Sequence, residues 1–122
     1  MNYELQITHE GQYILVWVAG DKNGYQVSLE IWGSVEKACA EHGCKKVLVL
    51  SNSAPLKTTE ASNHWEVFNK VGITPDYRIA WVEGNARTKE AAKLIETVLD
   101  NRGYWQARIF EDPAEAKKWL LE

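Results

Sequence analysis

The side chains best suited to bind or react lie directly after stretches that are typical of buried strands. Ser51, Asn52 and Ser53 follow the aliphatic run that ends at Leu50. Hydroxyl, amide and cationic groups recur in the next two connections, and together they form a candidate binding face made of Ser51, Asn52, Ser53, Lys57, Thr58, Thr59, Asn85, Arg87 and Thr88. These groups can act together only if the chain brings its strands to one edge.

Nucleophilic hydrolysis is one reaction that these residues suggest, with Ser51 or Ser53 as the nucleophile and His64 as the base. The Gly-x-Ser-x-Gly turn that presents such a serine is missing around both positions. None of the connections is rich in glycine, which argues against a phosphate-binding loop for a nucleotide. The sequence therefore predicts no cofactor, and a Ser-His hydrolase stays an alternative to a function in binding.

The spacing Cys39-x-x-His42-x-Cys44 contains three side chains that soft metal ions accept as ligands. Cys39 falls on the apolar stripe of a predicted helix, and Gly43 is predicted to end that helix. The three side chains should therefore diverge, and we predict no metal site.

Six tryptophans stand out in a chain of 122 residues. Each falls on a predicted inward stripe or in a predicted strand, so the first interpretation is a core built from large rings. The alternative is that some of them line an apolar pocket or a patch for self-association. Trp65, Phe68 and Leu94 form the candidate pocket, between the second and third predicted helices, and it would suit a small apolar or lipid-like ligand.

The elements that must position these groups can be predicted from hydrophobic periodicity. Apolar and polar residues alternate from Tyr3 to Thr8, which is typical of a strand that is solvated on one face, and a continuous apolar run follows from Tyr13 to Ala19. Apolar residues then recur at spacings of three and four up to Gly43, which indicates an amphipathic helix. Residues 46–50 form the next predicted strand.

The second half of the chain repeats this alternation of helix and strand. Its predicted elements are a helix that carries Trp65 and Phe68 and ends near Gly72, a strand at 77–82, a helix from the N-cap Asn85 to Gly103, an edge strand at 105–109, and a short helix opened by Asp112-Pro113.

The resulting order, β-β-α-β-α-β-α-β-α, predicts an α/β fold with a mostly parallel sheet of about five strands. Each helix carries the chain back across the sheet, so successive strands run parallel and only the first should be antiparallel. Nothing resembling a linker interrupts the pattern, so we predict one domain over residues 1–122. Ligands of such sheets bind beyond the carboxyl ends of the strands, which is where the candidate binding face should lie. Two edge strands also leave room for a homodimer.

Charge and hydropathy exclude several classes of function. The 14 basic and 17 acidic residues give a net charge of −3, spread over both halves, so no basic surface for nucleic acid is expected. The longest apolar run, from Tyr13 to Ala19, is far shorter than the roughly 20 residues that span a membrane. The first residues lack the pattern of a secretory signal, and we expect a cytoplasmic protein.

The stretch 101–120 carries a resemblance to a known family. Asn-Arg-Gly ends a helix, a short strand finishes on Arg-Ile-Phe, and a helix with Asp-Pro-Ala-Glu-Ala-Lys-Lys-Trp-Leu follows. Together with the element order and the strand at 45–50, this stretch resembles the SpoIIAA-like (STAS/SEC14-like) proteins. The resemblance implies four βα turns preceded by a hairpin. It also implies a function without catalysis, since relatives include anti-sigma-factor antagonists and lipid carriers.

The chain departs from the family's regulatory branch at one motif. That branch places a phosphorylatable serine in an Asp-Ser-Ser/Thr-Gly-like motif at the start of the second helix, whereas residues 55–62 contain hydroxyls but neither the glycine nor the Asp-Ser pair. No serine is therefore assigned as a phosphorylation site. We predict a small non-enzymatic regulatory or protein-interaction module with an unidentified protein partner. The alternatives are a carrier or sensor of a small apolar ligand and a Ser-His hydrolase.

Overall fold

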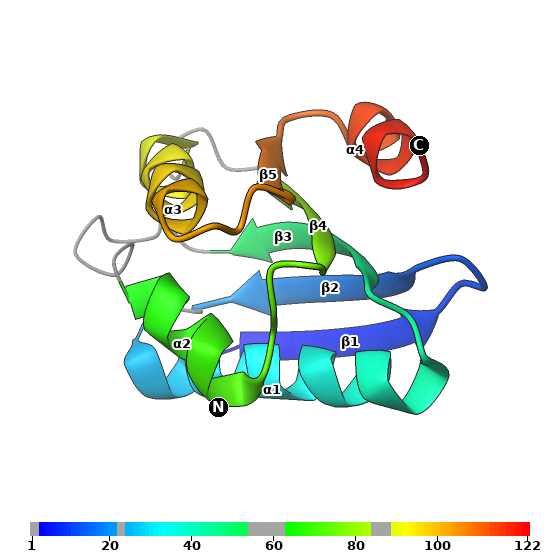
Figure 1. Cartoon of the computed structure of the whole chain (residues 1–122), viewed down its shortest axis with the longest axis horizontal. Helices are drawn as coiled ribbons and strands as arrows, with labels where there is room; N and C mark the ends of the chain where they lie inside the picture. The colour runs from blue at the N-terminus through cyan, green and yellow to red at the C-terminus, as the bar shows by residue number, and fades with distance from the viewer. Residues whose placement is uncertain (1–2, 22–23, 54–62, 84–88) are drawn as a thin grey trace.

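The computed structural model describes residues 3–21, 24–53, 63–83 and 89–122. The chain forms strands and helices in the predicted order (Figure 1), which are β1 (Tyr3–His9), β2 (Ile14–Gly20), α1 (Tyr25–His42), β3 (Lys46–Ser53), α2 (Asn63–Val71), β4 (Arg78–Glu83), α3 (Lys89–Asn101), β5 (Ala107–Phe110) and α4 (Pro113–Leu120). The predicted α/β class is confirmed. Within the described ranges, no helix combines the length and the apolar character needed to span a membrane.

The strands form one five-stranded sheet in the order β1-β2-β3-β4-β5. β1 pairs with β2 in antiparallel fashion, and every other neighbouring pair is parallel. The predicted antiparallel first strand and the edge position of the last strand are both confirmed. Because β2 to β5 point the same way, their carboxyl ends meet at one edge of the sheet, toward the left of Figure 1.

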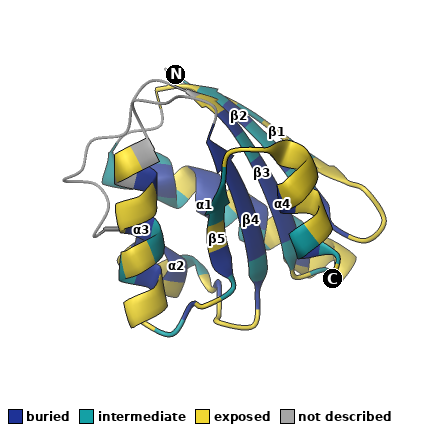
Figure 2. Cartoon of the chain, turned by 90° about the horizontal axis from the view of Figure 1, so that it is seen from above, coloured by how far each residue is buried: buried dark blue, intermediate teal, exposed yellow. Residues whose placement is uncertain are grey.

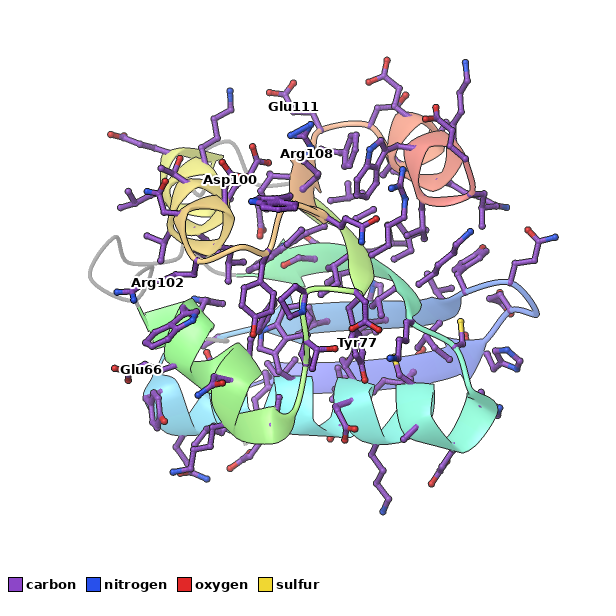
Figure 3. The ribbon with its side chains drawn as sticks, viewed as in Figure 1. Glu66, Tyr77, Asp100, Arg102, Arg108 and Glu111 are labelled. Carbon is purple, nitrogen blue, oxygen red and sulfur yellow. The ribbon has the colours of Figure 1, made fainter. Side chains whose placement is uncertain are left out.

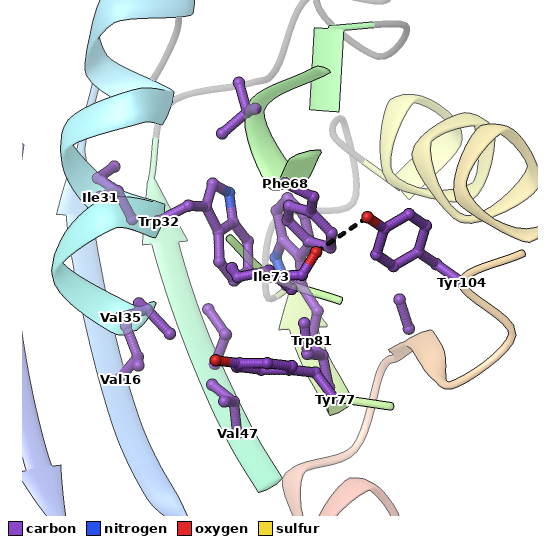
Figure 4. Packing of buried hydrophobic residues seen from close by; sticks show 14 of the residues in the cluster. Val16, Ile31, Trp32, Val35, Val47, Phe68, Ile73, Tyr77, Trp81 and Tyr104 are labelled. Atoms are coloured by element: carbon purple, nitrogen blue, oxygen red, sulfur yellow. Dashed lines mark hydrogen bonds between the residues drawn. The ribbon is translucent and has the colours of Figure 1, made fainter. Parts of the chain in front are cut away.

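Helices α1, α2 and α3 cover one face of the sheet, which we call the α1 face. Alternate residues of β2, β3 and β4 point into it, and they form one buried cluster with the inner sides of the three helices. Trp32 lies edge-on to Phe68 and to Trp81, with ring centroids 4.8 and 5.9 Å apart. Tyr104 joins the cluster by donating its hydroxyl to the backbone oxygen of Ile73 at 2.9 Å (Figure 4).

The opposite face, which we call the α4 face, carries α4 in the part of the chain that the structure describes. Figure 2 shows α4 lying over β3 and β4, while β1 and β2 pass beside it. Ala116 and Leu120 are buried against Leu48 and Ala80 in a second, smaller cluster. Arg78 holds the end of the helix in place, because its guanidinium stacks 3.9 Å from the Trp119 ring and donates to the Trp119 carbonyl at 2.6 Å.

Two helix ends follow the signals in the sequence. Gly43 adopts the left-handed conformation (φ 59°) after α1, which a residue without a Cβ does at little cost, and the Cys44 N–H then bonds back to the Cys39 carbonyl. Asp112 caps α4 by accepting a hydrogen bond from the Ala114 N–H, with Pro113 in the first turn. These are the ends that sequence analysis predicted.

The interpretation that all six tryptophans point inward is wrong for Trp105. That residue precedes β5, which begins at Ala107, and its side chain is 70% exposed. The alternation at 105–109 predicts a strand that begins two residues before β5 does. Tyr104, rather than Trp105, supplies the aromatic ring to the core. Trp32 and Trp81 are buried as predicted.

Candidate functional site

The carboxyl edge of the sheet gathers buried polar side chains. Among the described residues, the polar or charged side chains that are buried are Ser28, Ser51, His64 and Glu83. Ser51 and Glu83 lie at the ends of β3 and β4, and His64 lies in the first turn of α2. Burying polar groups costs free energy unless they are hydrogen-bonded, so a cluster of them marks this edge as the candidate site.

Strand register explains how these side chains meet. Ser51 and Glu83 are direct partners across the β3–β4 pair, and both share the α1 face with Trp81, two residues before Glu83. The Trp81 indole donates from Nε1 to the Glu83 carboxylate at 3.1 Å. The His64 ring lies 5.7 Å from the Trp81 ring at a tilt of 43°. A strand end and a helix start thus form one polar cluster against a large apolar ring.

This cluster adjoins a cavity on the α1 face. The cavity is lined by Ser28, His64 and Trp81 together with apolar side chains of β2, β3 and α1, and its volume is about 20 Å³. A space of that size holds about one water molecule. Ser28 and His64 give such a water two polar neighbours, whereas a lipid-like ligand would have to displace core side chains.

The residues of the predicted apolar pocket differ in how deeply they are buried. Phe68 is 1% exposed and packs edge-on against Tyr104, with ring centroids 5.5 Å apart. Trp65 is half-buried beneath the guanidinium of Arg102, 4.2 Å from its ring, and Leu94 is 42% exposed on α3. Phe68 thus belongs to the core, and none of the three lines the cavity at Trp81.

The predicted binding face is described only in part. Ser51 is 5% exposed and turned into the α1 face, while Asn52 is exposed. The backbone of Ser53 pairs with Gly20 as the last residue of β3. The remaining predicted residues lie outside the described ranges, namely Lys57, Thr58, Thr59, Asn85, Arg87 and Thr88.

The structure brings the residues of the hydrolase alternative to one end of the fold but buries them away from a substrate. Ser51 and His64 come to the same end of the fold, as that alternative requires, and Glu83 joins them. All three side chains are more than nine-tenths buried, whereas a nucleophile must reach a substrate carbonyl. Sequence analysis missed the bond between Trp81 and Glu83. Their i, i+2 spacing on a strand is the signal that could have revealed it.

The cysteines and histidines near the end of α1 take separate positions. Cys39 is buried on the α1 face, where loss of solvation raises the pKa of its thiol to about 12. His42 stacks on His9 of β1, with ring centroids 4.2 Å apart, and the Cys44 thiol lies 3.6 Å from the Lys46 carbonyl. No group of three or more potential ligands able to hold a metal ion occurs within the described ranges.

The outer surface beside the site combines aromatic and charged side chains. Arg102, from the end of α3, reaches across to Trp65 of α2, and Lys70 lies 6.0 Å from the Tyr25 ring. Figure 3 shows Arg102 and Glu66 where the end of α3 meets α2. Tryptophan and arginine are the residues most enriched at the centres of protein–protein interfaces.

Comparisons with known proteins bear on the fold. No protein-family profile matches the sequence, and no curated protein matches it. An anti-sigma factor antagonist from Mycobacterium paratuberculosis has a similar crystal structure, with a TM-score of 0.65 and 12% identity over 98% of this chain and 95% of the other. The match covers nearly the whole of both chains. The protein therefore has the SpoIIAA-like fold that the resemblance implied.

Proposed function

We propose that the protein is a small regulatory module that acts by binding a protein partner, without catalysis. The similarity of fold to an anti-sigma factor antagonist is the observation that carries this proposal. By analogy of fold, the class of partner would be an anti-sigma factor. Function depends on the site as well as on the fold.

Burial at the carboxyl edge favours binding over the two alternatives. The reactive groups of the hydrolase alternative, Ser51 and His64, are 5% and 3% exposed. A carrier of an apolar ligand needs an apolar volume of a few hundred Å³. The apolar cavity beside Trp81 has about 20 Å³, and the larger hollow of about 340 Å³ between β1 and the end of α1 is lined by charged and polar side chains such as Thr8, Lys37 and Glu41. Asn52 and Arg102 are exposed beside the site, and exposed polar groups suit contact with a protein better than catalysis by buried groups.

The proposed contact surface is the predicted binding face together with the start of α2. Among the described residues of this surface, Asn52 near the end of β3 is exposed. Arg102, which stacks on Trp65, lies next to it on the surface that we propose. The remaining members of the proposed surface lie outside the described residues and are Lys57, Thr58, Thr59, Asn85, Arg87 and Thr88.

The test measures binding of purified anti-sigma factors from the same genome to the immobilised full chain. Asn52→Arg should weaken the best binder at least about tenfold, since a bulky cation is placed at the centre of the contact. Asn69→Arg is the matched control, because Asn69 is also exposed but lies near the far end of α2; it should leave binding unchanged.

Three outcomes would overturn the proposal. One is that no anti-sigma factor binds. Another is ester hydrolysis by the wild type that Ser51→Ala abolishes, which would establish the enzyme. The third is a co-purified small molecule, seen by native mass spectrometry, whose loss leaves the protein unfolded, which would establish the carrier.

A further inference from the structure

The two faces of the sheet are covered to different extents. Three helices pack on the α1 face, whereas α4, with 8 residues, is the described helix on the other. Sheets of parallel strands are normally covered on both faces. Figure 2 shows β1 and β2 without a helix above them on the α4 face.

An apolar row crosses this open face at a single register. Trp17 pairs with Leu50, Leu50 with Val82, and Val82 with Phe110. These residues alternate with those that point into the α1 face, so all four side chains lie on the α4 face. Trp17, Leu50 and Phe110 remain half-exposed. Contiguous apolar side chains that stay partly exposed mark a surface for interaction, whereas single ones do not.

The open area has the dimensions of a helix site. Five strands spaced about 4.8 Å apart span roughly 20 Å, and packed helices lie about 10 Å apart. Since α4 packs over β3, β4 and β5, about one helix width is left over β1, β2 and the near side of β3.

Charges at the two ends of this area are of opposite sign. Glu4 of β1 and Asp21, which follows β2, are exposed toward the carboxyl end of this area. Toward the amino end, Lys117 lies 5.6 Å from the Tyr13 ring and Lys118 is exposed beside it, although Glu10 lies in the nearby turn. A helix laid beside α4 with its N-terminus at the acidic end would match both charge groups through its dipole, as α4 itself does.

We propose that the α4 face is a docking site for an amphipathic helix of a partner protein, with basic residues in its N-terminal half and acidic residues in its C-terminal half. The helix would place apolar side chains on Trp17 and Leu50 and run alongside α4, on the side of α4 away from Phe110. This surface is separate from the carboxyl-edge contact proposed above and does not depend on it.

The probe is a fluorescein-labelled peptide of about 14 residues, or four helical turns. Its leucines recur at helical spacing, with lysines in the first half and glutamates in the second. A second peptide exchanges lysine and glutamate, and a side-chain staple holds both helical so that helix propensity does not decide the result. Fluorescence anisotropy with the full chain should show that the lysine-first peptide binds at least about tenfold more tightly.

Variants of the protein test whether the peptide binds on the α4 face. Trp17→Ser should weaken the lysine-first peptide at least about tenfold, whereas Trp105→Ser should not, because Trp105 is exposed outside the α4 face. Glu4→Lys keeps the fold, since its side chain is in solvent, and should narrow the difference between the two peptides. An amide NMR spectrum of each variant checks folding, and Glu4→Lys keeps the test decisive if Trp17→Ser unfolds.

Several results would overturn the proposal. Equal affinity for both peptides would contradict the proposed charge complementarity. Lack of binding by either peptide would contradict the docking site itself. A wild-type dimer that Trp17→Ser converts to monomer would show that a second copy of the chain, not a partner helix, covers this face.

Discussion

The α1 face and the α4 face of the same sheet differ in how completely their apolar side chains are buried. On the α1 face, Trp32 contacts both Phe68 and Trp81 within a cluster that three helices cover. On the α4 face, Phe110 and Trp119 form a tilted pair, 5.4 Å apart, and both stay half-exposed. Stability should therefore reside mainly on the first face, which leaves the second one available for binding.

The largest effect is expected from Phe68→Ala. Its ring is 1% exposed between Trp32 and Tyr104, and removing a buried phenylalanine costs about 3–5 kcal/mol of unfolding free energy. Urea unfolding followed by far-UV circular dichroism measures the loss. A loss below about 1 kcal/mol would contradict the assignment of the main core to the α1 face.

Phe110→Ala makes the matched change on the α4 face, because the chain has only two phenylalanines. Its ring is half-exposed against Trp119, so we expect a loss of about 1–2 kcal/mol in the same urea experiment. An effect as large as that of Phe68→Ala would mean that the two faces are equally important for stability.

Alkaline pH should lower the stability of the fold through a thiol that is buried on the α1 face. The pKa of the Cys39 thiol is raised to about 12, first by burial, so the folded protein holds this proton more tightly than the unfolded chain does. Stability is therefore complete below about pH 9 and falls as the pH rises toward 12, by at most about 1.4 kcal/mol per pH unit.

Urea unfolding at several pH values between 7.5 and 10.5 tests this, with Cys39→Ala as the control. The variant should lose less stability between these limits than the wild type does. Burial raises the pKa of Tyr77 and Tyr104 as well, so part of the alkaline loss should remain. An identical pH dependence in both proteins would show that Cys39 makes no contribution.

The smallest change is expected from Asp112→Ala. This residue caps α4 through the Ala114 N–H, and losing such a cap costs about 1 kcal/mol. The loss should appear both in urea unfolding and as faster amide exchange in the first turn of α4. Asp112→Asn should keep most of the stability, since its side-chain oxygen still accepts the bond. If the alanine and asparagine variants were equally unstable, capping would not explain the effect.

Much of this fold follows from local patterns. The run from Tyr13 to Ala19 predicts a strand because it is too short for a buried helix, and Gly43 and Asp112 mark helix ends through conformations that depend on neighbouring residues. Trp105 was misplaced because alternation alone cannot tell a strand from the turn before it. At the candidate site, the sequence predicts that Ser51 and Asn52 follow a strand. It does not predict that Ser51 is buried, because burial depends on packing between distant parts of the chain.

The amino-acid sequence by itself determined the order of the strands and helices and the residues at which most of them begin and end. These depend on side-chain periodicity and capping, which act over a few residues. Only the tertiary structure decided that His64 meets Trp81, that Ser51 lies beside Glu83, and that Trp17, Leu50 and Phe110 form one row on a half-covered face. Those arrangements depend on strand register and helix placement, which join residues far apart in the chain and leave no local pattern.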